Sequence, residues 1–130
     1  MTSSANIDLV RELYANSGSP DVAAKLMDPD IVVDITPGYP YGGVFHGYES
    51  LMGDFFGPLF QLFGSMRAEA DEIYADDQGH VFVLGHYHAV TKEGVEVASR
   101  FAHVWTVENG RLVREWQTAD TAVLTQALEN

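Results

Sequence analysis

Two consecutive hairpins between His80 and Ala119 constrain the fold of this chain more than any other feature. Residues 81–91 alternate in hydropathy and are rich in β-branched and aromatic types, which is typical of a strand. Residues 92–94 interrupt this pattern, and residues 95–107 resume it. Asn109-Gly110 is the strongest short hairpin signal and leads into a third strand over 111–119. The sequence therefore predicts three antiparallel strands within one sheet.

The two turns also predict the register, because opposed residues of an antiparallel pair share a face. A three-residue loop at 92–94 places His86 opposite Arg100, and a two-residue loop at Asn109-Gly110 places Val104 opposite Glu115. One face would carry Phe82, Leu84, His86, His88, Arg100, Ala102, Val104, Val113, Glu115 and Gln117. The other would carry Val83, Tyr87, Phe101, His103, Trp105, Arg114, Trp116 and Thr118. We expect the chain's own helices to cover the first face and a second copy to cover the other, although a β-bulge would swap part of this assignment.

Length and charge narrow the function classes. The chain has 130 residues, which favours one domain over 1–130, and a formal charge of −12, which opposes nucleic acid and anionic membranes. It has no cysteine, so disulfides, thiolate metal sites and cysteine nucleophiles are excluded. The N-terminal residues do not resemble an export signal, and no apolar run reaches membrane-spanning length. We therefore expect a cytoplasmic protein.

The remaining segments predict helices on one side of the sheet. Ser19 as N-cap and Pro20 at the first helical position favour a short helix that continues over 22–27. Further helices are expected over 7–15 and 48–63 and after Asp120, and further strands over 31–35 and 66–75. Gly57-Pro58 should kink the helix over 48–63. This order predicts an α+β fold, in which a curved antiparallel sheet wraps around helices as an open cone.

The segment 36–47 is predicted to be a loop because it contains two prolines, four glycines and two tyrosines. Tyr39, Tyr41 and His46 would form the mouth of a cavity or hold this loop in place. Phe56 and Phe60 are core residues by default, and some of the phenylalanines of the following helix can also touch a ligand.

Three stretches resemble a known family: residues 28–34 (DPDIVVD), residues 45–51 (FHGYESL), and residues 101–113 (FAHVWTVENGRLV) with the later Asp120-Thr121. With the element order, they resemble the SnoaL-like and ketosteroid-isomerase-like branch of the NTF2-like superfamily over nearly the whole chain. The resemblance implies a cone-shaped fold with a cavity between sheet and helices, commonly dimeric through the outer sheet face. Members include isomerases, polyketide cyclases, epoxide hydrolases, dehydratases and non-catalytic binders, so fold alone does not select a reaction.

The resemblance also implies roles for individual residues. Asp34 falls where the isomerases keep the carboxylate that moves a proton between carbons. Tyr14 lies near the position of their oxyanion-stabilising tyrosine. If the first helix is displaced by a turn, Arg11 would occupy that position instead of Tyr14. Ala102 replaces the second, acidic oxyanion donor, which weakens a steroid-isomerase assignment. Asp120 resembles the acidic residue that begins the tail of SnoaL-like cyclases, as either a catalytic group or a helix cap.

The candidate chemistry is acid/base catalysis without a cofactor. Asp34 in an apolar cavity would have the raised pKa that suits a general base, unless it is an exposed strand-end residue. His86, His88, Arg100, Glu115 and Gln117 would form a polar wall that binds a carbonyl or enolate oxygen, or else an internal network in which Arg100 neutralises Glu115. Two strand histidines with no third ligand fall short of a metal site.

The outer sheet face is expected to form a homodimer through Phe101, His103, Trp105 and Trp116, because large exposed aromatic side chains need a partner. The favoured function is an isomerase, polyketide cyclase or hydratase/epoxide hydrolase type of enzyme acting on a small apolar molecule, polyketide-like or steroid-like, that bears oxygen. Asp34, Tyr14, Arg100 and Glu115 would be catalytic, and the ligand would touch His86, His88, Gln117, Tyr39, His46, Phe56, Phe60 and Asp120. The alternative is a non-catalytic binding or assembly module with the same fold.

Overall fold

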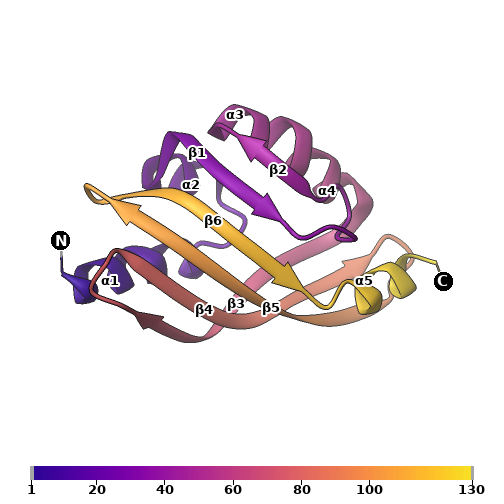
Figure 1. The fold of residues 1–130 in the computed structure, drawn as a ribbon. Coiled ribbons are helices and arrows are strands. Elements are labelled where there is room, and N and C mark those ends of the chain that lie inside the picture. The colour runs from indigo at the N-terminus through magenta and orange to yellow at the C-terminus, as the bar shows by residue number, and fades with distance from the viewer. Residues whose placement is uncertain (1, 130) are drawn as a thin grey trace.

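The computed structural model describes residues 2–129 and has the predicted α+β architecture (Figure 1). One sheet has the strand order β2-β1-β6-β5-β4-β3. Its strands are β1 (Met27–Ile35), β2 (Gly43–His46), β3 (Phe63–Ala75), β4 (His80–Thr91), β5 (Glu96–Glu108) and β6 (Arg111–Ala119). All neighbouring strands are antiparallel except β1 and β6, which run parallel. The segment 36–47, predicted to be a loop, contains the short edge strand β2 near its end. The sequence did not predict this strand, because the glycines and prolines around it are typical of loops.

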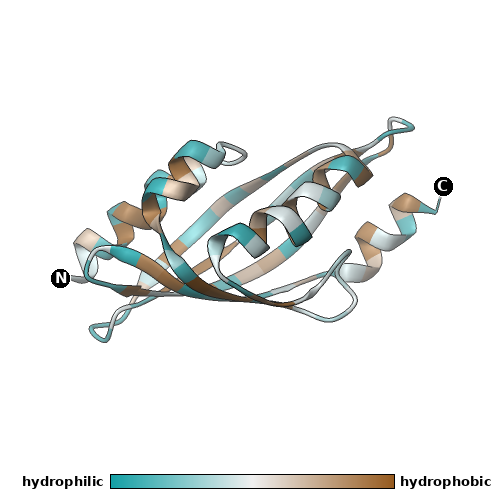
Figure 2. Cartoon of the chain, turned by 90° about the horizontal axis from the view of Figure 1, so that it is seen from above, coloured by the Kyte–Doolittle hydropathy of each residue, from teal (hydrophilic) through white to brown (hydrophobic). Residues whose placement is uncertain are grey.

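Helices pack within the bend of this sheet (Figures 1 and 2). They are α1 (Ser3–Ala15), α2 (Pro20–Leu26), α3 (Tyr48–Ser50), the π-helical segment η1 (Leu51–Phe56), α4 (Gly57–Leu62) and the C-terminal α5 (Thr121–Leu128). Ser19 caps α2 as predicted, since its hydroxyl accepts from the Val22 N–H. Asp120 caps α5 in the same way through the Val123 N–H. Within residues 2–129, the helices are all too short or too polar to cross a bilayer.

The predicted kink before Pro58 takes the form of a π-helical segment. The Gly57 N–H bonds the carbonyl of Met52, five residues back, where an α-helix would use the residue four back. Proline at 58 supplies no N–H, so the α-helical ladder is already incomplete at this point. The π-helical segment keeps Leu51, Phe55 and Leu59 buried against the sheet across the irregularity.

Alternating hydropathy along the strands separates an inner from an outer sheet face (Figure 2). In β4, Val81, Val83 and Tyr87 are buried, whereas Phe82 and Leu84 are exposed. In β5, the same alternation buries Phe101, His103, Trp105 and Val107. The residues of β4 and β5 are divided between the two faces as predicted, but the face under the helices is the aromatic one, so the prediction of which face lies inside is wrong.

The β4–β5 register itself agrees with the prediction, whereas the β5–β6 register does not. His86 pairs with Arg100, as the three-residue turn predicted. After the Asn109-Gly110 turn, a β-bulge shifts the register between Thr106 and Val107, so Val104 pairs with Trp116 where Glu115 was predicted. The bulge places Glu115 and Gln117 on the same face as Trp105 and His103.

Gly85 allows the sheet to bend where β3, β4 and β5 meet. A Cβ at this position would lie 2.0 Å from the Glu69 carbonyl oxygen and 2.6 Å from Cζ of Phe101. The facing strand β3 is irregular at the same place, between Ala70 and Glu72. Only a residue without a side chain admits the backbone of one neighbour and the ring of the other.

We expect Gly85→Ala to lower the free energy of unfolding by about 2 to 3 kcal/mol or more, because backbone must move to admit the methyl group. Gly53→Ala is the control, since Gly53 is exposed and a Cβ there meets nothing within 4 Å. Its unfolding free energy should change by about 1 kcal/mol or less. Urea denaturation of the three proteins measures both values, and equal stability of the two variants would contradict the close approach at Gly85.

Candidate functional site

A cavity of about 440 Å³ lies between the inner face of the sheet and the helices α1, α2, η1 and α4. Its wall is mostly apolar, with Phe55, Phe56 and Phe60 on the helical side and Met27, Ile35 and Met66 on the sheet side. Polar side chains from α1, β4, β5 and β6 gather around His103 at one part of this wall. These are Tyr14, Tyr87, His103, Trp105 and Glu115. A volume and lining of this kind suit a small apolar ligand with a few polar atoms at one end.

His103 is the centre of the polar end. Its Nε2 lies 2.6 Å from the Tyr87 hydroxyl, and its Nδ1 contacts the Tyr14 hydroxyl and lies 3.2 Å from Oε2 of Glu115. The imidazole also stacks on the Phe101 ring, at a centroid distance of 3.9 Å. Both ring nitrogens are therefore engaged, and the ring plane is held by packing.

Two further donors complete this network. The Trp105 Nε1–H donates to the Tyr14 hydroxyl over 2.8 Å, and the Gln117 Nε2 donates to the Tyr87 hydroxyl over 2.9 Å. Alternation along β5 and the bulge before β6 bring these side chains to one face. A buried polar network of this kind is costly unless its members are satisfied, and here each has a partner.

Burial makes Glu115 and His103 neutral near pH 7. Desolvation raises the pKa of Glu115 to about 8 and lowers the pKa of His103 to about 3. Desolvation also raises the pKa of Tyr14 well above its ordinary value, and Glu115 adds to this effect. The polar end thus offers an un-ionised carboxylic acid and an un-ionised phenol to a ligand.

Five of the predicted site residues line the cavity: Tyr14, Tyr39, Phe56, Phe60 and Glu115. Gln117 is buried behind them and reaches the cavity through Tyr87. The structure therefore brings together the predicted tyrosine, one predicted carboxylate and the predicted aromatic wall.

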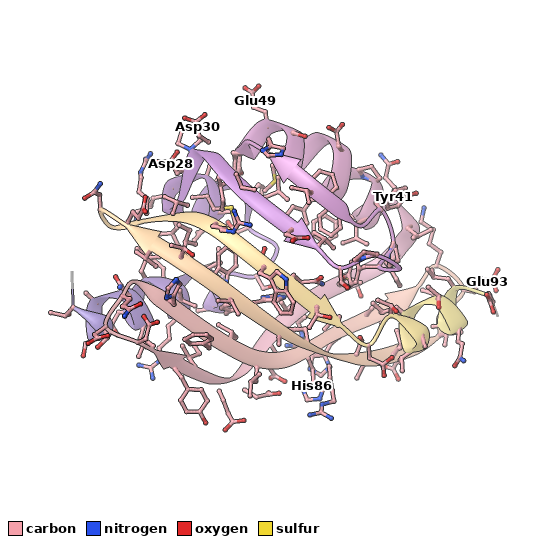
Figure 3. All side chains as sticks on the ribbon, in the orientation of Figure 1. Asp28, Asp30, Tyr41, Glu49, His86 and Glu93 are labelled. Atoms are coloured by element: carbon pink, nitrogen blue, oxygen red, sulfur yellow. The ribbon has the colours of Figure 1, made fainter. Side chains whose placement is uncertain are left out.

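Arg100, His86 and His88 do not face the cavity, contrary to the predicted polar wall. They lie on the outer face, where the imidazoles of His86 and His88 contact Asp71 over 2.5 Å and Glu69 over 2.9 Å. Figure 3 shows His86 at the lower margin of the molecule. Burial of the large aromatic side chains on the opposite face outweighs any preference for enclosing charged ones.

Three other predicted residues are also outside. Asp34 points away from the cavity, because Ile35, its neighbour in β1, lines the cavity and Asp34 pairs with the exposed Trp116. His46 is exposed on the edge strand β2. Asp120 is exposed and serves as the cap of α5. The general-base role predicted for Asp34 has no support from its position.

Sequence reasoning missed His103, Trp105 and Tyr87 as site residues. The sequence assigned Phe101, His103 and Trp105 to an outer interface, but all three are buried on the inner face. The available signal was the alternation itself, since Phe101, Trp105 and Val107 are more apolar than Arg100, Ala102 and Val104. Among the described residues, no group of three or more His, Asp or Glu side chains is arranged to hold a metal ion.

Comparison with known proteins defines the class. A model of the SnoaL-like domain matches residues 10–115, and the chain belongs to this family. The comparison with curated proteins finds no match.

Solved structures show the fold. An NTF2-like protein from Burkholderia thailandensis E264 is 23% identical, with a TM-score of 0.87 over 100% of this chain and 99% of that one. TerC, co-crystallised with polyporic acid, is 23% identical with a TM-score of 0.86 over 97% and 99%. IdmH of Streptomyces antibioticus, a proposed polyketide cyclase, is 19% identical with a TM-score of 0.78 over 96% and 99%. These likenesses confirm the expected NTF2-like fold.

The raised pKa of Glu115 and the lowered pKa of His103 predict a specific dependence of stability on pH. Between pH 4.5 and 6.5 the unfolded chain holds one proton on this pair, on His103, and the folded protein holds one on Glu115, so the pair adds no slope. From pH 6.5 to about 8 the unfolded pair holds none and the folded pair still holds one. Stability should fall there by about 1.4 kcal/mol per pH unit, or roughly 2 kcal/mol in all.

Urea denaturation at pH 6.5 and 8 measures this fall, and Glu115→Gln should remove it. Glu108→Gln is the control, because Glu108 is exposed at the end of β5. A wild-type stability that stays level over this interval would show that Glu115 is already ionised at pH 6.5.

Proposed function

We propose that the protein is an acid/base enzyme of the isomerase or polyketide cyclase type, acting on a small, largely apolar ketone bound in the cavity. The observation that carries this proposal is the position of Glu115, a buried carboxylic acid with a pKa of about 8 that lines a mostly apolar pocket together with Tyr14. A pKa near the working pH suits a group that transfers protons.

The proposed reaction begins with enolisation of the ligand. Tyr14 donates a hydrogen bond to the carbonyl oxygen, and Glu115 transfers its proton to that oxygen as the C=O bond becomes C–O. A water molecule in the cavity takes the proton from the adjacent carbon, and the electron pair of that C–H bond forms the C=C bond. Glu115 regains a proton from solvent. The enol is then available for isomerisation or for ring closure onto a second carbonyl.

This assignment changes the residues expected from the sequence and keeps the type of chemistry. Asp34 and Arg100 leave the proposed mechanism because they lie on the outer face. Tyr14 and Glu115 remain in it. His103 and Trp105 enter it as partners of Tyr14.

Exchange of the α-hydrogens of 2-tetralone for deuterium in D₂O, followed by NMR, tests the proposed activity. We expect the wild type to accelerate exchange over buffer and the rate to fall above pH 8. Glu115→Gln and Tyr14→Phe should each lower it by about 100-fold, because they remove the proton donor and the oxyanion donor. Asp34→Asn is the matched carboxylate-to-amide control and should leave exchange unchanged.

Full exchange activity in Glu115→Gln would overturn the proposed mechanism. Polyporic acid is a second probe, since the structural neighbour TerC was co-crystallised with it. Tight binding of polyporic acid without any exchange of 2-tetralone would favour the other candidate function, a non-catalytic small-molecule binder.

We also propose that the outer sheet face forms a homodimer, with a contact set different from the one expected. The strand pairings place Phe82, Val104 and Trp116 in one row across β4, β5 and β6. Phe82 is 38% exposed, Trp116 is 46% exposed and Leu84, in the adjacent row, is 43% exposed. A contiguous apolar row on the exposed face of a sheet suits a second copy of the same surface.

Trp116→Glu should convert the dimer to monomers in sedimentation velocity, because it places a charge within this row. Tyr41→Glu is the control, since Tyr41 is 50% exposed but lies in the loop between β1 and β2, outside this row. A wild type that sediments as a monomer, or a Trp116→Glu variant that remains dimeric, would contradict the proposed interface.

A further inference from the structure

Gln117 has one orientation in the buried network. The backbone N–H of Thr36 donates to Oε1 of Gln117 over 3.1 Å. An N–H can only donate, so this atom of the amide group must be the oxygen. The amide nitrogen is then the atom that lies 2.9 Å from the Tyr87 hydroxyl, and it donates to that oxygen.

The direction of the hydrogen bond from Gln117 to Tyr87 also determines the direction of the hydrogen bond between Tyr87 and His103. Its hydroxyl is buried and, among the described residues, has two hydrogen-bond partners, Gln117 Nε2 and His103 Nε2. Since it accepts from Gln117, its own proton must go to His103 Nε2. A proton on Nε2 would aim a second donor at the same oxygen and leave the Tyr87 proton with no acceptor, which is costly in a buried site. The imidazole therefore carries its proton on Nδ1.

The Nδ1–H determines what the cavity end can do. It donates to the Tyr14 oxygen, and the Trp105 Nε1–H donates to the same oxygen. The two lone pairs of Tyr14 are thus engaged, and its proton is free for a ligand. Glu115, whose Oε2 lies 3.2 Å from Nδ1, is the second acid group of the cavity lining.

We infer that Gln117, Tyr87 and His103 form a directional relay that leaves only hydrogen-bond donors at the buried end of the cavity, so that this end selects a carbonyl oxygen over a hydroxyl group of the same shape. The inference specifies the ligand class of the proposed enzyme, and it rests on the proposed function for the location of the ligand. A ketone or quinone oxygen accepts from Tyr14 and Glu115. An alcohol in the same place brings a donor that meets no free acceptor.

The relay residues are positioning residues, because Gln117 and His103 act on the ligand through Tyr14. The opposite arrangement would have given a different site. With the imidazole proton on Nε2, Nδ1 would accept from Tyr14 and remove the very proton that a carbonyl needs. The single amide group of Gln117, oriented by a backbone N–H of the loop after β1, sets which of the two exists.

Two measurements test the relay. Long-range ¹H–¹⁵N NMR of the ligand-free protein reports which nitrogen of His103 is protonated, with assignment by a His103→Gln variant. Calorimetric titration then compares 9-fluorenone with 9-fluorenol, which share one ring skeleton and differ in the oxygen group. We expect the Nδ1–H form in the wild type and a preference of about tenfold for the ketone, the usual effect of one unmatched buried polar group.

Gln117→Met is the decisive variant, because Gln117 does not line the cavity and the Thr36 N–H keeps its bond to the backbone carbonyl of residue 117. It should give a mixture of tautomers and reduce the ketone preference to about threefold or less. Tyr87→Phe should do the same by removing the relay hydroxyl. Tyr74→Phe, a change of the same kind on the exposed edge strand, should behave as the wild type.

An Nε2–H or doubly protonated His103 in the wild type would overturn the relay, and this measurement needs no variant that might unfold. An undiminished ketone preference in a folded Gln117→Met protein would overturn it as well. Failure of the proposed catalysis is a separate result, because deuterium exchange could be lost in a protein that still has the Nδ1–H form and the ketone preference.

Discussion

The hydrogen bond between Tyr87 and His103 is the interaction on which the site depends. It lies on the inner face of the sheet, where desolvation penalises any charge, and it gives a buried imidazole a donor in place of a counter-ion. The neutral ring can then sit against Phe101 as a flat, largely apolar side chain. Because the histidine needs no ionised partner, the neighbouring Glu115 has no cation to stabilise its carboxylate and keeps its proton up to about pH 8.

The parts of the fold that depend on local chemistry could be predicted from the sequence. The glycine turns, the Ser19 cap and the alternating strands gave an α+β fold with the correct β4–β5 register. The bulge near Thr106 could not be predicted, because an extra residue in a ladder leaves no distinctive composition. Since the side-chain period of a strand is two, this single residue reversed the predicted faces of β6 relative to β5.

The choice of inner face failed for a different reason. A set containing Arg100, two histidines and Glu115 resembled a catalytic wall, so it was placed inside, although enclosing Arg100 would have required a dedicated partner. The structure instead encloses Phe101, Trp105 and Tyr87, whose burial contributes more to stability. The bulge then moves Glu115 and Gln117 across to join them. Tyr14 lines the cavity as expected, because its place on the first helix does not depend on strand register.

The three candidate carboxylates, Asp34, Glu115 and Asp120, lie in different surroundings in the fold. Asp120 accepts a backbone N–H at a helix end, and Asp34 stands on the outer face beside Trp116, so neither faces the cavity. Glu115 alone is carried inside, by a strand whose neighbour supplies a histidine that is itself neutral. An acidic chain with a formal charge of −12 thus contains a buried pair, Glu115 and His103, that has no net charge near pH 7. Surface charge and site chemistry are independent here, since one is set by solvated residues and the other by a desolvated pair.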